Sequence, residues 1–191
     1  MWYRIRTHRL SYLALLVGIV AFSSACTTTT ITPELAQTPT AKYETVIVGD
    51  ITTDNELWQS RVAYFRQGLT QRLTESQAFD QVLTVAPEKL PASSILLSGK
   101  ITEVEKGSKA LRFIIGFGAG KAHASGLFRI RDDSGDVLAK FESRKAYSGG
   151  AGIGGVDLLD VDDLMQKLGE ETANSVIRWS QGGSLKPPAA Q

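Results

Sequence analysis

Apolar residues in the first half of the chain follow two different periods, and the change of period marks the predicted elements. The segment "YETVIVGDI", residues 43–51, is β-branched and apolar enough for a buried strand. The next segment, "TDNE", Thr53 to Glu56, has the spacing of a capping box and predicts the start of a helix. "FDQVLTV", residues 79–85, predicts a second strand, and a strand, helix, strand series favours a right-handed parallel crossover. The helix that starts after Thr53 has apolar residues spaced three and four positions apart, which form one face: Trp58, Val62, Phe65, Leu69 and Leu73.

The second half of the chain predicts three further strands and a closing helix. Strands are expected over residues 95–105, 121–131 and 137–147, and "DDSGD" between the last two predicts a tight turn at Gly135. The closing helix runs from about residue 159 to 180, with apolar residues on one face. The predicted fold is α+β: a four- or five-stranded mixed sheet with two helices packed on one face, in the order β-α-β-β-β-β-α. It forms a single domain over residues 43–180.

The first 25 residues have the composition of a secretory signal peptide. Three arginines precede an apolar segment, residues 10–22, and Ser23, Ser24 and Ala25 then lead to Cys26. The apolar segment is shorter than the ~20 residues that a membrane-spanning helix needs. Small residues before the only cysteine resemble the lipobox of bacterial lipoproteins, which implies that Cys26 carries fatty chains such as palmitate. Ordinary cleavage after Ala25 is the alternative.

Composition predicts loose segments on both sides of the domain. Residues 26–42 comprise Cys26 and a threonine-rich stretch that we interpret as a flexible tether, and residues 181–191 are expected to be a disordered tail. Loss of the signal peptide removes three of the 21 basic residues and none of the 20 acidic ones, so the mature chain has 18 against 20. A chain without basic excess is not expected to bind nucleic acid.

Two glycine clusters have the outline of nucleotide-binding motifs but fail their spacing or context. In "GFGAGK", residues 116–121, only three residues separate the first glycine from Gly-Lys, and an alanine follows. "GAGIGG", residues 150–155, fits G-x-G-x-x-G, yet no strand follows its helix. Four aspartates at that helix start would also repel a pyrophosphate, and we interpret them as acids that cap the helix and complement its dipole: Asp157, Asp160, Asp162 and Asp163.

The mature chain has few residues for catalysis. His123 is its only histidine, so neither a His/Cys metal site nor a Cys–His pair is expected. Strand alternation places His123 on the face opposite Phe128 and Ile130, where a solvated histidine is the expected role. We predict a protein that is not an enzyme, with no catalytic residue, no metal and no cofactor.

The segment "RFIIGFGAGKAHASG", which begins at Arg112, allows two interpretations. It could continue a strand that buries one face, or it could be a long connection that presents apolar residues to a partner. The predicted contact surface is residues 112–120. Within it Arg112 is the ionic contact, Phe113, Ile115 and Phe117 are apolar anchors, and Gly116, Gly118 and Gly120 separate them.

Residues 99–138, "GKITEVEKGSKALRFIIGFGAGKAHASGLFRIRDDSGDVL", resemble the uncharacterised bacterial lipoprotein family catalogued as domain of unknown function 4410. The shared residues include Gly99, Arg112, the run at 115–120 and Gly135. The resemblance implies this fold and an envelope location and adds no mechanism.

The function expected from the sequence is that of a lipid-anchored periplasmic lipoprotein that binds a protein partner or self-associates as an assembly module. Thr27 after the cysteine favours the outer membrane, facing the periplasm. Two alternatives stay open: a small-ligand or nucleotide-binding protein that uses the glycine-rich loops, and an oligomeric, membrane-associated pore component.

Overall fold

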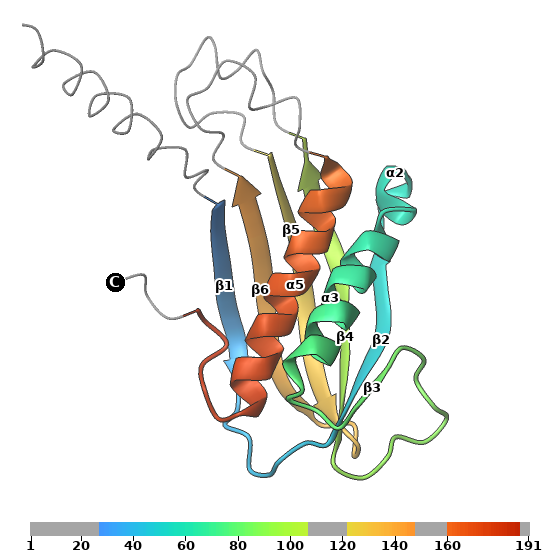
Figure 1. Ribbon diagram of the computed structural model, residues 1–191, viewed down its shortest axis with the longest axis vertical. Coiled ribbons are helices and arrows are strands. Elements are labelled where there is room, and N and C mark those ends of the chain that lie inside the picture. Colours follow the sequence, from blue (N-terminus) through green and yellow to red (C-terminus); the bar gives the residue numbers. More distant parts are fainter. Residues whose placement is uncertain (1–26, 107–121, 148–159, 188–191) are drawn as a thin grey trace, which may run out of the picture.

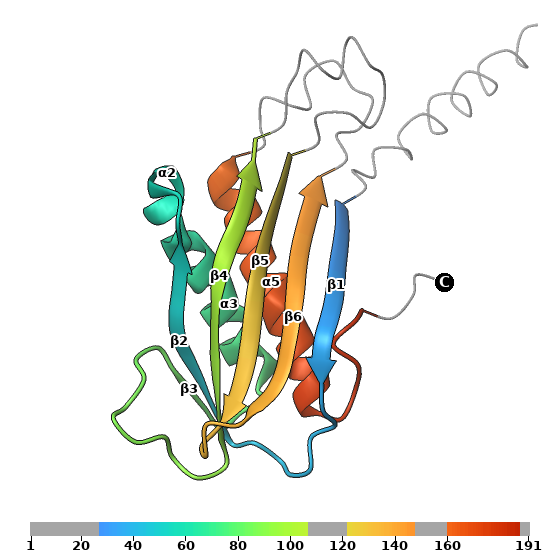
Figure 2. The ribbon, with the colours of Figure 1, turned by 180° about the vertical axis from the view of Figure 1, so that it is seen from behind.

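The computed structural model describes residues 27–106, 122–147 and 160–187, and within them six strands form one sheet in the order β1-β6-β5-β4-β2-β3. Two long helices, α3 and α5, cover one face (Figure 1), and the opposite face carries no helix in the described part of the chain (Figure 2). The elements in chain order are β1 (Thr27–Ala36), β2 (Thr45–Thr53), α2 (Glu56–Gln59), α3 (Val62–Ser76), β3 (Gln81–Leu83), β4 (Ser94–Glu105), β5 (Ala122–Asp132), β6 (Val137–Tyr147) and α5 (Val161–Ser180).

The predicted α+β class and the mixed sheet are confirmed, but the sheet has one strand more than expected. The parallel crossover is present, since β2 pairs in parallel with both β3 and β4. β5 and β6 are antiparallel and join through the predicted turn, where Gly135 has φ +91°. At this position the left-handed backbone favours glycine because it has no Cβ.

The additional strand is β1, so the flexible-tether interpretation is wrong for Thr27–Ala36. β1 pairs antiparallel with β6 over its length, with an irregularity between Pro33 and Leu35. Ile31 is buried, whereas Thr30 and Thr32 on either side of it are exposed. The threonine run therefore forms a strand, because threonine favours β structure and its side chains alternate between the two faces of the sheet. Composition alone does not reveal this alternation.

The tail prediction is also wrong for residues 181–187. Leu185 is buried, and its carbonyl accepts a hydrogen bond of 3.0 Å from Nη2 of Arg178. The amide of Gly183 donates to the carbonyl of Arg178 at 2.9 Å. These contacts fold the chain back onto the end of α5, and residues 188–191 lie outside the described part.

The two long helices contact each other through glycines. A Cβ atom on Gly169 of α5 would lie only 2.2 Å from the carbonyl oxygen of Phe65 on α3. A Cβ atom on Gly68 of α3 would lie 2.2 Å from the carbonyl oxygen of Gln166 on α5. The helix backbones can approach this closely only because neither residue has a side chain. Below the helices, the ring of Phe65 stacks on Phe128 of β5 at 5.2 Å.

One ion pair is built into the covered face of the sheet. Lys145 of β6 is buried, and its Nζ lies 2.9 Å from Oε1 of Glu171 on α5 and 2.9 Å from Oγ1 of Thr29 on β1. Burial alone would raise the pKa of Glu171, but hydrogen bonds and the charge of Lys145 outweigh it and hold the pKa below its usual value. The pair joins an edge strand, its neighbour and the helix above them.

Candidate partner-binding groove

Strand β4 extends further than its neighbour β2 at one end of the sheet. The parallel register ends where Thr53 lies opposite Ile101, and β4 continues to Glu105. Within the described residues, Glu103–Glu105 pair with β5, and Thr102 lies at a shift in that register. On the other side Thr102–Glu105 pair with no strand. Their backbone groups on that side form a short open edge, which is a ready place for another chain to add a strand.

Asn55, two residues after the end of β2, starts helix α2 and turns the chain away from the sheet. Its backbone is extended, with φ −93° and ψ 111°, and its Oδ1 accepts a hydrogen bond of 3.0 Å from the amide of Leu57. Asn55 therefore caps α2, whereas the capping box predicted from Thr53 and Glu56 does not form. The Oγ1 of Thr53 instead accepts from the amide of Asn55 at 3.3 Å. As a result the chain after β2 forms helix α2 beside the end of β4 and does not continue as a strand paired with it.

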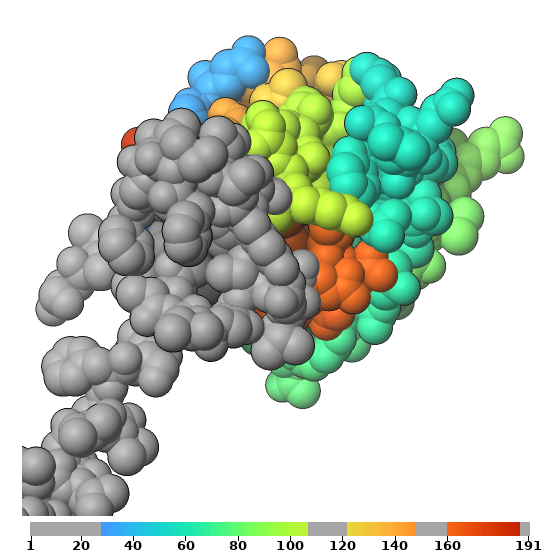
Figure 3. Space-filling view, turned by 90° about the horizontal axis from the view of Figure 1, so that it is seen from above, coloured from blue at the N-terminus to red at the C-terminus, as the bar shows by residue number. Residues whose placement is uncertain are grey.

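A groove of about 760 Å³ separates α2 from the end of β4. The space-filling view shows the α2 region next to the end of β4 (Figure 3). Its lining comes from two stretches of chain: Thr53, Asp54, Asn55, Glu56, Leu57 and Trp58 on the α2 side, and Lys100, Ile101, Thr102, Glu103, Val104 and Glu105 on β4.

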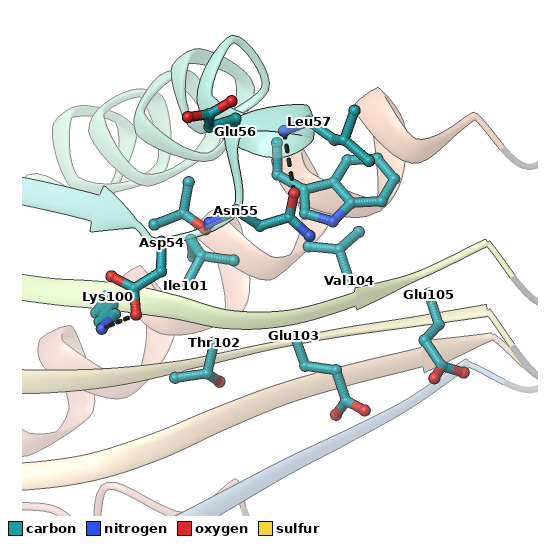
Figure 4. Close-up of a pocket in the computed structure, with 12 residues that line it drawn as sticks. Asp54, Asn55, Glu56, Leu57, Lys100, Ile101, Thr102, Glu103, Val104 and Glu105 are labelled. Carbon is teal, nitrogen blue, oxygen red and sulfur yellow. Dashed lines mark hydrogen bonds and ion pairs between the residues drawn. The ribbon is translucent and has the colours of Figure 1, made fainter.

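The part of the groove under α2 is apolar. Ile101 and Val104 point from β4 toward α2 (Figure 4), and both are buried. Leu57 on α2 is 73% exposed, and Trp58 is partly buried against the core. An exposed leucine beside a half-covered tryptophan leaves apolar surface at the rim, which is typical of contact sites.

Two cations lie over the indole of Trp58. The guanidinium of Arg61 is 5.5 Å from the ring centre, and the ammonium of Lys106 is 6.0 Å from it. Arg61 also forms an ion pair of 2.9 Å with Asp162, in the first turn of α5. These contacts hold Trp58 at the base of α2 and connect it to the helix layer.

The other side of β4 is acidic. Glu103 and Glu105 point away from α2 (Figure 4), toward the face of the sheet that α3 and α5 leave open. An oxygen of Glu103 lies 3.0 Å from Nε2 of His123 and 3.4 Å from Nη1 of Arg144. An oxygen of Glu105 lies 3.9 Å from Nδ1 of His123. His123 is buried between these carboxylates, so the expectation of a solvated histidine is wrong although its predicted face of the strand is right.

Glu103, Glu105 and His123 are also the described residues that could hold a metal ion, since one ligand atom from each lies within 4.8 Å of the others. The two carboxylates, however, approach different nitrogens of the imidazole, and Arg144 shares the same Glu103 oxygen with it. A metal requires the donor atoms to converge on one point. The arrangement suits a cross-strand charge cluster better than a metal site.

Most residues proposed from the sequence as functional lie outside the described residues. These are Cys26, Arg112, Phe113, Ile115, Gly116, Phe117, Gly118 and Gly120. The helix-capping interpretation of the aspartates is confirmed for Asp160, whose Oδ1 accepts from the amide of Asp162 at 3.0 Å, and Asp157 is not described. Asp163 accepts a hydrogen bond of 2.8 Å from the hydroxyl of Tyr147. Burial, with that bond and the nearby charges, raises the pKa of Tyr147.

The described part of the chain contains no helix that is both long and apolar enough to span a bilayer.

The chain belongs to a family that is defined by sequence. The chain is a member of the family described as "Domain of unknown function (DUF4410)", whose model matches residues 33–151, as the sequence resemblance predicts. No curated protein matches the chain significantly.

Two solved structures are similar to the chain at low identity. Both are PelC dodecamers from Paraburkholderia phytofirmans. One, in space group P6, is 15% identical with a TM-score of 0.46 and covers 75% of this chain and 96% of its own. The other, a single-substitution variant in space group C2, is 17% identical with a TM-score of 0.44 and covers 76% and 95%. At TM-scores this low the likeness bears on neither the assembly nor the function of this chain.

Proposed function

We propose that this chain is a lipid-anchored periplasmic lipoprotein that acts as a non-enzymatic protein-binding or assembly module of the cell envelope. The observation that supports binding is the open edge of β4 beside the exposed side chain of Leu57. A free strand edge offers backbone hydrogen bonds, and an adjacent apolar surface offers a pocket for side chains. The partner is either a different protein or another copy of this chain.

The anchor would position this groove close to the membrane. β1 begins at Thr27, so an acylated Cys26 would be joined to the sheet without a tether. The end of the sheet where β1 starts also carries the end of β4 and helix α2 (Figure 1). A domain held in this way on the outer membrane would meet its partner at the membrane-facing end. The contact surface predicted from the sequence, residues 112–120, follows Lys106 in the sequence, and Lys106 lies over Trp58.

Site-specific cross-linking in intact cells tests the binding role. A photo-reactive phenylalanine analogue in place of Leu57 should give a discrete adduct with a partner or a second copy. The matched control is the same analogue in place of Val85, which is 78% exposed and lies outside the groove. Similar adducts from both positions, or none from position 57, would contradict the proposed role.

Fractionation tests the anchor separately. Cys26→Ser should move the protein from the membrane to the soluble periplasmic fraction and abolish incorporation of labelled palmitate. The lipobox-like sequence, and no observation on the folded domain, motivates this expectation. Release of the wild-type chain into the soluble fraction would refute the anchored form while leaving the binding test unaffected.

A further inference from the structure

We propose that the groove binds an extended polypeptide segment in which basic and apolar side chains alternate, and that this segment pairs as an added strand with Thr102–Glu105. This inference rests on the proposed binding function and specifies the chemistry of the partner. It follows from three properties of the groove: the open backbone edge, the different characters of the two sides of β4, and the distribution of charge.

The backbone supplies the first argument. β2 pairs with β4 only as far as Ile101, and α2 lies beside the remaining four residues without pairing with them. An added strand would continue the line of β2 and take up hydrogen-bonding groups that the described chain leaves open on that side.

The two sides of β4 supply the second argument. Successive side chains of a strand point to opposite faces of a sheet. Ile101 and Val104 are three residues apart and point to the same side because the register of β4 shifts at Thr102. Along the regular part of the edge, an added strand would place every second side chain on the side of Val104 and Ile101, under α2, where the surface is apolar. The side chains in between would lie beside Glu103 and Glu105. Apolar residues fit the first set of positions, and the second set requires a polar or charged partner.

The sign of the charge supplies the third argument. The groove lining contains the acids Asp54, Glu56, Glu103 and Glu105, and its only lysine, Lys100, forms an ion pair with Asp54. Among the cations near the groove, Arg61 pairs with Asp162, and Arg144 and His123 both approach Glu103. Lys106 lies over the ring of Trp58.

Of the two acids on β4, Glu105 is the less compensated. Its side chain is 59% exposed, with an imidazole nitrogen at 3.9 Å. Opposite charges on neighbouring strands stabilise pairing and like charges oppose it, so the facing residue is a lysine or an arginine.

Fluorescence anisotropy of labelled peptides with the full chain in detergent tests this inference. The probe is an eight-residue peptide of alternating lysine and valine. One comparison peptide replaces each lysine by glutamate, and a second keeps the lysines but carries backbone N-methyl groups, which remove the donors needed for strand pairing. The lysine peptide should bind, the glutamate peptide should bind at least about fivefold more weakly, and the N-methylated peptide should not bind.

A charge reversal at one exposed residue makes the test specific to the groove. Glu105→Lys should weaken binding of the lysine peptide by about fivefold and strengthen binding of the glutamate peptide. Glu88→Lys makes the same change in charge at an exposed loop residue outside the groove and should leave both affinities unchanged. Because both positions are exposed, neither variant should alter folding, which circular dichroism can verify.

The outcomes separate this inference from the proposed function. Equal affinity for the lysine and glutamate peptides, retained binding of the N-methylated peptide, or no effect of Glu105→Lys would overturn the inference. If no peptide binds while Leu57 still gives its adduct in cells, the groove binds a partner of different chemistry and only the inference fails. Failure of both experiments would reject the binding role as well. Self-association through the groove that the lysine peptide does not displace would identify a second copy as the occupant and overturn the inference.

Discussion

The seam between α3 and α5 and the groove between α2 and β4 are two contacts of a helix with its neighbour, and they are built in opposite ways. In the seam, Gly68 and Gly169 bring the two backbones into direct contact, and no space remains for even a methyl group. In the groove, α2 lies apart from β4 across about 760 Å³, and none of the residues of α2 is buried. The first contact is complete within the chain, whereas the second leaves an apolar rim and an open strand edge.

This difference separates the part of the molecule that maintains the fold from the part that we propose binds a partner. Free energy gained by closing the seam contributes to folding, because both surfaces belong to the same chain. Free energy available at the groove is realised only when another segment covers it. Substitutions in or below the seam should therefore change stability without changing recognition, and substitutions in the groove should do the reverse.

The largest effect is expected from Glu171→Gln, because it leaves Lys145 buried without a counter-charge below α5. The side chain of Lys145 is only 7% exposed, so water cannot compensate for the loss. We expect the free energy of unfolding to fall by about 3 kcal/mol, measured by urea denaturation. The double variant Lys145→Met/Glu171→Leu, which removes both charges, should recover most of this loss. Equal destabilisation of the single and double variants would show that the charge pair is not the cause.

The same pair predicts a dependence on pH with a defined sign. Because the folded-state pKa of Glu171 is lowered, its contribution to stability is fully present above the ordinary carboxyl pKa of 4.5 and is lost as the pH falls through the lower folded value. The difference in unfolding free energy between the wild type and Glu171→Gln should therefore be constant near neutrality and shrink below pH 4.5. A difference that does not change between neutral and acidic pH would contradict this assignment.

The next effect is that of Gly169→Ala in the seam. Alanine is intrinsically favoured over glycine in a helix by about 1 kcal/mol, so propensity alone predicts stabilisation. The added Cβ would instead collide with the carbonyl of Phe65, and we expect a net loss of about 2–3 kcal/mol. Ala63→Gly, on the exposed side of α3, is the control and should lose only the propensity difference. A stabilising Gly169→Ala would mean that the helices can separate at no cost.

In the groove the expected effect is on binding. Leu57→Ser removes an exposed side chain, so the unfolding free energy should change by no more than about 0.5 kcal/mol. Partner binding should weaken by about 1–2 kcal/mol, roughly five- to thirtyfold in affinity. Val85→Ser serves as the control, since it truncates an equally exposed side chain outside the groove. A large stability change for Leu57→Ser would place α2 within the cooperative core and remove the contrast with the seam.

Local periodicity predicts the parts of the fold whose residues lie close together in sequence. The strands β4, β5 and β6 and the helix α5 fall within one or two residues of their predicted bounds. β1 is missed because its partner, β6, is more than a hundred residues distant and only pairing gives the threonine run its buried and exposed sides. The predicted single helix from Trp58 to Leu73 is interrupted between Gln59 and Val62, and a regular stripe of apolar residues gives no sign of that break.

The candidate groove could not be predicted, since it depends on the register between strands. Nothing in the sequence fixes that Thr53 lies opposite Ile101 and that β4 continues beyond it. Trp58 fits the apolar stripe of the predicted helix and is therefore assigned to the core, although it lines the groove. The adjacent Leu57, which does not fit the stripe, is the one available signal that apolar surface remains exposed there.

The smallest effect is expected from removing the N-cap side chains of α2 and α5. The two substitutions can be compared directly because Asn55 and Asp160 make the same kind of hydrogen bond. Each side chain accepts a hydrogen bond of 3.0 Å from the amide two residues later, at the start of α2 and of α5 respectively. Replacing either residue by alanine should cost about 1 kcal/mol of local helix stability.

For Asp160→Ala this cost should lower the global free energy of unfolding, because α5 packs on the core along its length. For Asn55→Ala it should leave the global value almost unchanged and instead increase hydrogen exchange at the amide of Leu57 by about fivefold, since α2 can open without the rest of the domain. If Asn55→Ala lowers global stability as much as Asp160→Ala does, α2 unfolds together with the seam. The groove would then be a rigid part of the fold, and the prediction that α2 opens independently of the core would be wrong.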